Sequence, residues 1–313
     1  MAVSRCGDGP GELESAALAG PGRELAEDSG VDPEWTPSGL LVLDTEERDT
    51  ALAWAAGAGV GLESVDAVRA LSLEPRLAPA EVDASLGALW FGEVAQVRNP
   101  RLVRALRGSL DRRAIEVREH TEVTGLAVRA GRIEGVKTPN GVLAAPKVVV
   151  ASGAWSARVL AEVGLALDVE PVRGQMLAFR AEPGLVRRMV LGRERYVIPR
   201  RDGRVLVGST LEYVGFDKGT TDDARGALYK EALRLIPALA ECEVEHHWAG
   251  LRPGSPTGVP FIGAHPAIDG LFVNAGHFRN GVVLAPASAR LAADLCLGRT
   301  PILEAGPYAP ISG

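Results

Sequence analysis

The sequence lacks the features that would assign it to several large protein classes. Its three cysteines, Cys6, Cys242 and Cys296, are far apart, and they form neither a CxxC pair nor the even-numbered framework of a disulfide-stapled secreted protein. No 18 uncharged apolar residues run together, and the first twenty residues contain no apolar run of secretory length. These absences predict a cytoplasmic protein with reduced thiols.

The sequence also lacks an excess of basic residues. The chain has 34 Lys and Arg against 40 Asp and Glu, which leaves a formal net charge of −6. Such a balance offers no electrostatic surface for nucleic acid or for an anionic membrane. Small molecules are therefore the expected partners.

The motifs of several enzyme classes are missing too. The sequence holds no P-loop, GxSxG, HExxH or paired-cysteine zinc pattern. Two glycine series, Gly7-x-Gly9-x-Gly11 and Gly57-x-Gly59-x-Gly61, lack the GxGxxG spacing, and neither follows an apolar strand. We therefore interpret neither series as a dinucleotide site.

The chain has 313 residues, enough for about two domains, and it shows no internal repeat. In its first half, the pattern predicts helices over 13–28, with a break at 20–22, over 46–56 and from Asn99-Pro100 onward. Strands are predicted over 38–43, 115–118, 121–129, 133–138, 142–143 and 147–151. An antiparallel meander followed by a fully apolar strand is typical of the inner part of a doubly wound nucleotide-binding sheet. The helix after Asn99 carries an apolar stripe of Leu102, Val103, Leu106 and Leu110.

The second half predicts a strand over 169–180, a hairpin of 196–199 with 205–208, and a capped helix over 221–235. Further strands are expected over 243–250 and 271–274. A last helix is expected from about Gly281 to Leu297, with Gly298 as its stop.

The segment Gly276-His277-Phe278-Arg279-Asn280-Gly281 lies between an apolar strand and the last helix. A strand, a glycine-bounded loop and a helix aim backbone N–H groups and a positive dipole end at an anion or an electron-rich ring edge. The same pattern also serves simply to close an α/β unit, so by itself it leaves both interpretations open.

Two further side chains could bind a carboxylate. Arg252 ends a strand between small residues, and its planar fork suits two hydrogen bonds to a carboxylate, although an exposed ion-pairing arginine has the same pattern. Tyr196 could offer a hydroxyl to the same group, or it could be packing within a strand. His246 and His247 are adjacent strand residues that point to opposite faces, so no metal site is expected.

Five segments, in this order along the chain, resemble one flavoprotein family. They are VVVASGAWSARV (148–159), PVRGQMLAF (171–179), YVIPRRDGRVLVGSTLEYVGFDKG (196–219), WAGLRPGSPTGVPFIG (248–263) and GHFRNGVVLAPASARLAADLCLG (276–298). The family is that of glycine oxidase and D-amino acid oxidase, and the resemblance is closest to the bacterial glycine oxidases of thiamine biosynthesis. It covers nearly all of the chain after about residue 15.

The resemblance implies an α/β (mixed α+β) fold in which two domains interleave. An FAD-binding, Rossmann-like domain would comprise residues 1–35, 98–160 and 252–313, and an antiparallel-sheet substrate domain would comprise 36–97 and 161–251. It also implies FAD as cofactor, a small amino acid and dioxygen as substrates, and a homo-oligomer. The implied activity is oxidative deamination of glycine, other small amines or D-amino acids, with release of hydrogen peroxide.

The resemblance also assigns roles to individual residues. Arg252 would hold the substrate carboxylate, Tyr196 would hydrogen-bond to it, and Arg279 would line the same pocket. Leu211 would be an apolar pocket wall, and Val123 would lie near the adenine through its backbone. Flavin contacts would come from one loop and the helix start that follows it: Gly276, His277, Phe278, Arg279, Asn280, Gly281, Val282 and Val283.

The sequence departs from the family at its N-terminus. Family members begin with a strand, GxGxxG, a helix and an acidic residue for the ribose, and no such segment is present. From this we expect a truncated chain with its true start upstream, and weak or no FAD binding by the chain as written. Two alternatives remain open: a membrane-linked D-amino acid dehydrogenase of the same fold, and an inactive remnant or binding module.

Overall fold

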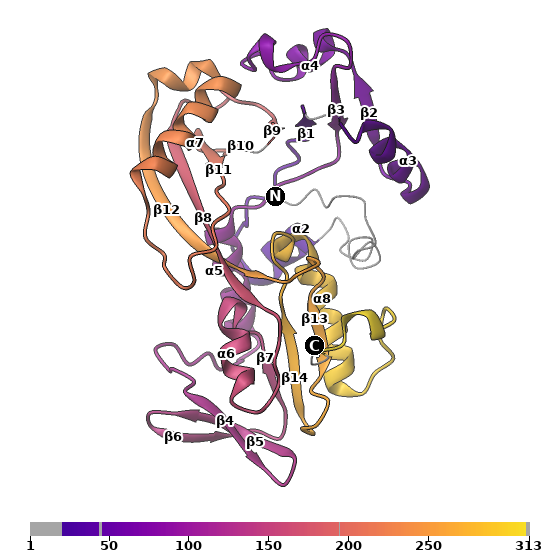
Figure 1. The fold of residues 1–313 in the computed structure, drawn as a ribbon, viewed down its shortest axis with the longest axis vertical. Coiled ribbons are helices and arrows are strands. Elements are labelled where there is room, and N and C mark those ends of the chain that lie inside the picture. The colour runs from indigo at the N-terminus through magenta and orange to yellow at the C-terminus, as the bar shows by residue number, and fades with distance from the viewer. Residues whose placement is uncertain (1–20, 44–45, 194, 311–313) are drawn as a thin grey trace.

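A large curved sheet occupies one end of the molecule, and smaller sheets and the last helix occupy the other (Figure 1). The computed structural model describes residues 21–43, 46–193 and 195–310. Its helices are α2 (Pro21–Ser29), α3 (Arg48–Ala58), α4 (Ala67–Leu73), α5 (Asn99–Arg112), α6 (Ser156–Ala161), α7 (Asp222–Leu235) and α8 (Gly281–Leu297).

The strands come mainly from the middle of the chain. In the first half they are β1 (Leu40–Val42), β2 (Leu62–Val65), β3 (Ala88–Phe91), β4 (Gly125–Arg129), β5 (Arg132–Thr138), β6 (Gly141–Ala144) and β7 (Val148–Val150). In the second half they are β8 (Glu170–Arg180), β9 (Met189–Leu191), β10 (Tyr196–Pro199), β11 (Arg204–Gly208), β12 (Glu243–Gly254), β13 (Phe261–Ala264) and β14 (Leu271–Ala275).

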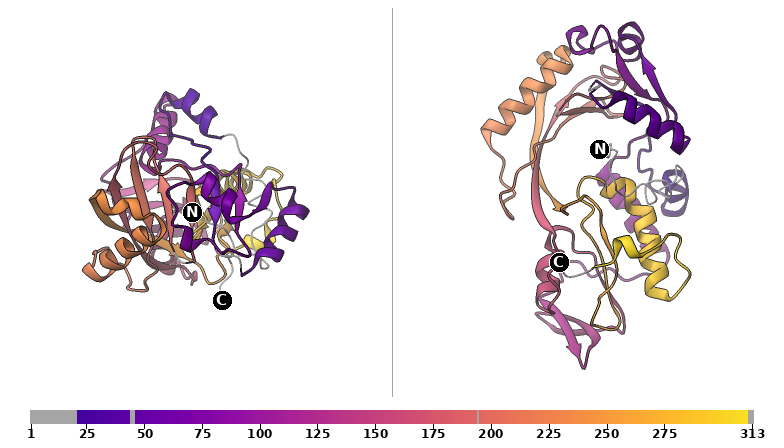
Figure 2. Two further views of the ribbon diagram at one scale, coloured as in Figure 1. Left: turned by 90° about the horizontal axis from the view of Figure 1, so that it is seen from above. Right: turned by 45° about the vertical axis from the view of Figure 1, so that its right-hand side comes forward.

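The large sheet has eight strands in the order β12-β8-β11-β10-β9-β1-β3-β2. Its strands derive from two stretches of chain, 40–91 and 170–254. The long strands β8 and β12 pair along their whole length, and β12 forms the edge, which is where a sheet tolerates a proline such as Pro253. In the right-hand view of Figure 2 the sheet is curved, with its concave side toward α8.

Helices cover one face of this sheet. Leu177, Val197 and Val207 of the strands join one hydrophobic cluster with Leu228 and Leu235 of α7, to which α4 also contributes. Because side chains alternate along a strand, residues such as Tyr196, next to Val197, point to the opposite face. That second face is the one on which the candidate site lies.

A three-stranded sheet, β13-β14-β7, forms the centre of the other end. Strands β14 and β7 are parallel, and each leads into a helical segment at its carboxyl end. Helix α8 packs on this sheet through Leu284 and Leu291, which are fully buried with Ile262 of β13. The meander β4-β5-β6 projects beyond it (Figure 1), and its first turn places Ala130 and Gly131 in the left-handed region, with φ of 48° and 73°.

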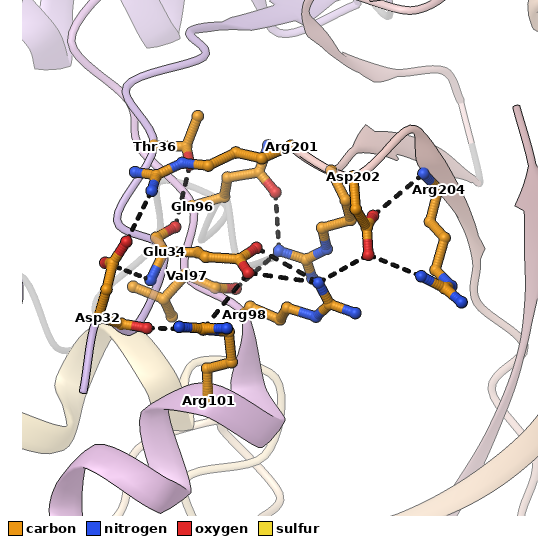
Figure 3. Close-up of polar contacts among 11 residues, drawn as sticks. Asp32, Glu34, Thr36, Gln96, Val97, Arg98, Arg101, Arg201, Asp202 and Arg204 are labelled. Atoms are coloured by element: carbon orange, nitrogen blue, oxygen red, sulfur yellow. Dashed lines mark hydrogen bonds and ion pairs between the residues drawn. The ribbon is translucent and has the colours of Figure 1, made fainter. Parts of the chain in front are cut away.

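A charged cluster joins three distant segments where the two ends of the molecule meet (Figure 3). Arg98, just before α5, contacts Asp202 in the β10–β11 turn at 2.8 Å and Glu34 at 3.3 Å. Arg201 of the same turn contacts Asp32 at 2.8 Å. Single exposed ion pairs contribute about 0–1 kcal/mol, so the fixing effect of this cluster depends on its pairs acting as a network.

Most sequence-based elements of the second half are confirmed. Thr221 caps α7 by accepting a hydrogen bond from the Ala224 N–H, and Gly298 ends α8 in the left-handed region. Gly59 of the rejected series Gly57-x-Gly59-x-Gly61 likewise ends α3, with φ of 67°. The helix predicted over 13–28 is described only from Pro21, and the series Gly7-x-Gly9-x-Gly11 lies outside the described residues.

Two predictions for the first half are wrong. Residues 115–118 form no strand, and the strand predicted over 121–129 begins only at Gly125. The apolar stripe of α5 is not buried: Val103 is 65% exposed and Leu106 49%. The small residues of α5 face α2 instead, with Ala105 fully buried and Gly108 close enough that a Cβ would lie 3.1 Å from the Ser29 carbonyl oxygen.

Candidate functional site

Four neighbouring strands present the candidate site on one face of the large sheet. Gly208 of β11 pairs with Tyr196 of β10 on one side and with Met176 of β8 on the other. Gly174, two residues before Met176, pairs with Gly250 of β12, two residues before Arg252. Because directly paired residues and residues two apart share a face, these side chains all point the same way. Arg252 fills the space over Gly174, and Met176 and Tyr196 fill the space over Gly208, whereas the space over Gly250 is open.

The guanidinium of Arg252 lies over Gly174 and is held by the segment that follows β11. Its Nη2 donates to Ser209 Oγ at 2.6 Å, and its Nη1 donates to the Thr210 carbonyl oxygen at 3.3 Å. Gly174 lies directly against it, since a Cβ there would be 2.0 Å from Nη1. The guanidinium therefore has a fixed position, with donors left over for a ligand.

The charge of Arg252 has no acidic partner in the described part of the chain. Burial lowers the pKa of its guanidinium, and the like charge of Arg279 lowers that pKa further, while Tyr196 raises it. Within residues 21–43, 46–193 and 195–310, neither arginine forms an ion pair with a carboxylate. A half-buried cation near a second cation is stabilised when an anion joins it, so the pair favours a bound anion.

Tyr196 lies beside Arg252 with its ring buried and its hydroxyl near the Arg252 guanidinium. The side chain is 8% exposed, and its hydroxyl contacts Met176 Sδ at 3.8 Å. A thioether is a weak acceptor, so the hydroxyl remains able to donate to a stronger one. Tyr196 and Arg252 of the predicted trio thus lie together, while Arg279 is exposed and lies close enough for its charge to lower the pKa of Arg252.

The loop between β14 and α8 closes the site from the other side. The Phe278 N–H donates to the Pro253 carbonyl oxygen at 2.9 Å, which joins this loop to the residue after Arg252. Gly276 and Phe278 both take positive φ, 81° and 44°, so the chain turns sharply before the helix. The Asn280 side chain does not cap α8, and Val282 and Val283 are about half exposed. The first amides of α8 can therefore face the electron-rich edge of a flavin ring.

His277 lies beneath this loop and is mostly buried. Its Nε2 is 3.0 Å from Ser288 Oγ on the second turn of α8. Burial lowers the pKa of His277 to about 4, so the ring is neutral at neutral pH. It therefore ties the loop to the helix and adds no charge to the site.

Two other residues that the sequence indicated lie outside this cluster. Val123 is 42% exposed and precedes β4, in the part of the molecule that carries the small meander. Leu211 follows the segment that holds Arg252 and is 48% exposed. Among the described residues, no group of three His, Cys, Asp or Glu could hold a metal ion, and no described helix is long and apolar enough to cross a membrane.

Sequence reasoning missed the residues that hold Arg252 in place. A glycine inside an otherwise apolar strand, such as Gly174, often marks a close approach by another group, and that signal was available. The contacts of Ser209 and Thr210 had no comparable signal, because they depend on the pairing of β11 with β8 and of β8 with β12.

Comparison with known proteins agrees with the family resemblance seen in the sequence. The family model described as FAD dependent oxidoreductase matches residues 10–295. A protein of Pseudomonas putida named glycine oxidase is 48% identical over 290 residues, which are 92% of this chain and 78% of that protein. A Synechocystis protein named bifunctional protein ThiO/ThiG is 37% identical over 70% of this chain and 34% of its own length.

Solved structures resemble the whole described fold. The crystal structure of glycine oxidase from Geobacillus kaustophilus superposes with a TM-score of 0.88 at 32% identity, covering 96% of this chain and 82% of that one. L-proline dehydrogenase from P. horikoshii has a TM-score of 0.84 at 22% identity, which shows a shared fold alone.

Proposed function

This chain belongs to the FAD dependent oxidoreductase family, and from that premise we propose that it oxidises glycine in thiamine biosynthesis. Glycine would lose a hydride and a proton to become the imine, which water hydrolyses to glyoxylate and ammonia, while dioxygen is reduced to hydrogen peroxide. Relatives named glycine oxidase and ThiO/ThiG support this substrate and this pathway. Other small amines and D-amino acids carry the same reacting groups and are the substrates to compare.

One observation carries the proposal: a half-buried arginine and a tyrosine hydroxyl lie together on one face of the sheet, with a second arginine nearby and no acidic partner among the described residues. A carboxylate satisfies this arrangement because it supplies negative charge and two acceptor oxygens in one plane. A Cβ on Gly250 would meet nothing within 4 Å, so this glycine leaves room for a small group on the same face. A small amino acid fits all three conditions.

FAD, when bound, accepts the hydride from the substrate carbon and passes the electrons to dioxygen. The described residues position the substrate for this chemistry. Arg252 fixes the carboxylate with two parallel bonds, and Tyr196 adds a third, so the amine and the α-carbon have a defined place. The loop before α8 forms the facing wall and its backbone is shaped by Gly276 and Phe278.

The residues that would hold the flavin are those of the same loop and helix start, Gly276 to Val283, and Val123 is proposed for the adenine end. The free amides at the start of α8 support the first assignment. We also propose the domain division inferred from the sequence, with 36–97 and 161–251 as the substrate domain. The large sheet supports it by taking its strands from 40–91 and 170–254. A homo-oligomer and a cytoplasmic location complete the proposal.

An oxygen electrode tests this function. Protein expressed from its own gene and supplied with FAD should consume oxygen and release peroxide when glycine is added. A D-amino acid dehydrogenase would instead reduce an added dye and leave oxygen untouched, and the relatives do not favour it. Absence of both reactions with glycine, sarcosine and D-alanine would exclude an amine oxidoreductase.

A further inference from the structure

A buried arginine lies on the opposite face of the sheet from Arg252 and Tyr196. Arg173 precedes Gly174 on β8, so its side chain points away from the face that carries Arg252. Arg173 is 5% exposed, and its charge faces Glu212 and Asp217 on the segment after β11. The described contacts of the proposed substrate site do not include it.

Arg173 fixes both ends of this segment. Its Nε donates to Glu212 Oε2 at 2.9 Å, and its Nη1 donates to the Gly219 carbonyl oxygen at 3.0 Å. The backbones of Arg173 and Glu212 also exchange two hydrogen bonds, at 2.8 and 3.0 Å. Tyr213, between the two ends, is 61% exposed. The arginine therefore anchors an otherwise open loop to β8, the strand next to the edge strand β12.

Glu212 extends this anchor to Thr210, the residue whose carbonyl oxygen holds Arg252. The Thr210 hydroxyl donates to Glu212 Oε1, and the Gln175 amide Nε2 donates to the same oxygen at 3.0 Å. The Gln175 N–H donates to Thr210 Oγ1 at 2.8 Å, and the Thr210 N–H donates to the Gln175 carbonyl oxygen at 3.2 Å. Thr210 is thereby fixed on both its backbone and its side chain, and it is 7% exposed.

A continuous chain of polar contacts then reaches the substrate side. It runs from Arg173 through Glu212 and Thr210 to the guanidinium of Arg252. Burial alone would raise the pKa of the Glu212 carboxyl, but hydrogen bonds from Thr210, Arg173 and Gln175 lower it, so Glu212 is an anion at neutral pH. The direction of the Arg252 fork depends on where Thr210 and Ser209 are held.

We propose that Glu212 is a positioning residue for the substrate carboxylate, acting through Thr210 on Arg252. This inference rests on the proposed function, because it takes Arg252 as the group that binds the carboxylate. A displacement of the fork by a fraction of an ångström weakens two parallel hydrogen bonds together. Glu212 therefore sets carboxylate affinity without contacting the substrate.

The test compares Glu212→Gln with Asp217→Asn. Each substitution removes one carboxylate charge that faces Arg173, but Asp217 is 61% exposed and accepts from Arg173 Nη1 and the Gly219 N–H, whereas Glu212 accepts from the Thr210 hydroxyl. The probe is glycolate, which has a carboxylate and no amine, titrated into the FAD-supplied protein and followed by flavin absorbance. Glu212→Gln should raise the glycolate Kd and the glycine KM by about tenfold or more, with kcat nearly unchanged. Asp217→Asn should leave both constants within about twofold.

A second pair of variants keeps the test decisive if Glu212→Gln does not fold. Thr210→Val removes the hydroxyl that bonds to Glu212 and should reproduce the rise in Kd, whereas Thr210→Ser keeps the hydroxyl and should preserve the wild-type value. A wild-type Kd in Glu212→Gln or in Thr210→Val would overturn the proposal, as would equal shifts in Glu212→Gln and Asp217→Asn. Failure of the wild-type protein to bind glycolate and oxidise glycine would instead overturn the proposed function, and this inference with it.

Discussion

The backbone of Gly174 lies directly against the guanidinium of Arg252, so closely that a Cβ on Gly174 would be 2.0 Å from Nη1. The two residues are on paired strands, and the arginine fills the space that a side chain on the glycine would need. Strand β8 thus helps to determine the position of the Arg252 fork, although it contributes no polar atom to it.

Gly174→Ala should displace the Arg252 fork and raise the glycine KM by at least about tenfold. The extra methyl group should also lower the free energy of unfolding by about 1–3 kcal/mol, because the neighbouring atoms have to shift. Gly226→Ala in α7 is the control, since a Cβ there meets nothing within 4 Å. Steady-state kinetics and urea unfolding check both variants. An unchanged KM in Gly174→Ala would show that the fork does not depend on this contact.

Arg252→Lys should raise the glycine KM by about a hundredfold, because lysine keeps the charge but cannot form two parallel hydrogen bonds. Such a loss corresponds to about 2–3 kcal/mol, the range for a hydrogen bond to a charged group. Arg180→Lys, on an arginine of β8 whose side chain is 64% exposed, makes the same change away from the site and should leave KM unaltered. Equal KM values for the two variants would argue against carboxylate binding by Arg252.

Tyr196→Phe should raise the glycine KM by about five- to tenfold, as expected for one hydrogen bond worth about 1 kcal/mol. Stability should change little, because the hydroxyl makes a long 3.8 Å contact with Met176 Sδ and otherwise faces Arg252. Tyr229→Phe removes a hydroxyl from α7 and serves as the matched control. If both variants kept the wild-type KM, Tyr196 would contribute only to packing and not to substrate binding.

His277 predicts a pH dependence of stability. Its pKa is lowered by burial to about 4 from 6.5, so between these values the unfolded chain binds more protons than the folded one. The free energy of unfolding should therefore fall as the pH drops from 6.5 towards 4, by up to about 3 kcal/mol from this residue. His277→Gln should flatten that part of the curve, measured by urea unfolding at several pH values. His246→Gln, at a side chain that is 62% exposed, should leave it unchanged, and a similar slope in all three proteins would exclude His277 as the cause.

Local sequence patterns predicted elements whose ends are set by local chemistry. The cap at Thr221 and the stop at Gly298 are examples, since each depends on one side chain or its absence. The apolar stripe of α5 does not indicate how this helix packs. The helix packs against α2 through Ala105 and Gly108, and that contact depends on the position of α2. The strands β2 and β3 went unpredicted because four residues carry too little periodicity to be recognised.

The candidate site likewise combines residues that the sequence indicated with residues that only the tertiary structure reveals. Taken singly, Arg252, Tyr196 and Arg279 each have an ordinary structural interpretation. The resemblance to the family is what predicted them as site residues. Gly174 and Glu212 were not predicted, because their importance follows from strand register and from contacts between residues about 40 positions apart. Such contacts form only in the tertiary structure, and no local pattern in this one sequence predicts them.

Anaerobic reduction of the bound flavin tests the central claim most directly, since it needs neither oxygen nor a coupled assay. Glycine and methylamine present the same amine, but only glycine carries the carboxylate that Arg252 and Tyr196 are placed to bind. The FAD-supplied protein should lose its flavin absorbance rapidly with glycine and should keep it with methylamine at the same concentration. Equal bleaching by both amines, or by neither, would contradict the assignment of this site to an amino-acid carboxylate.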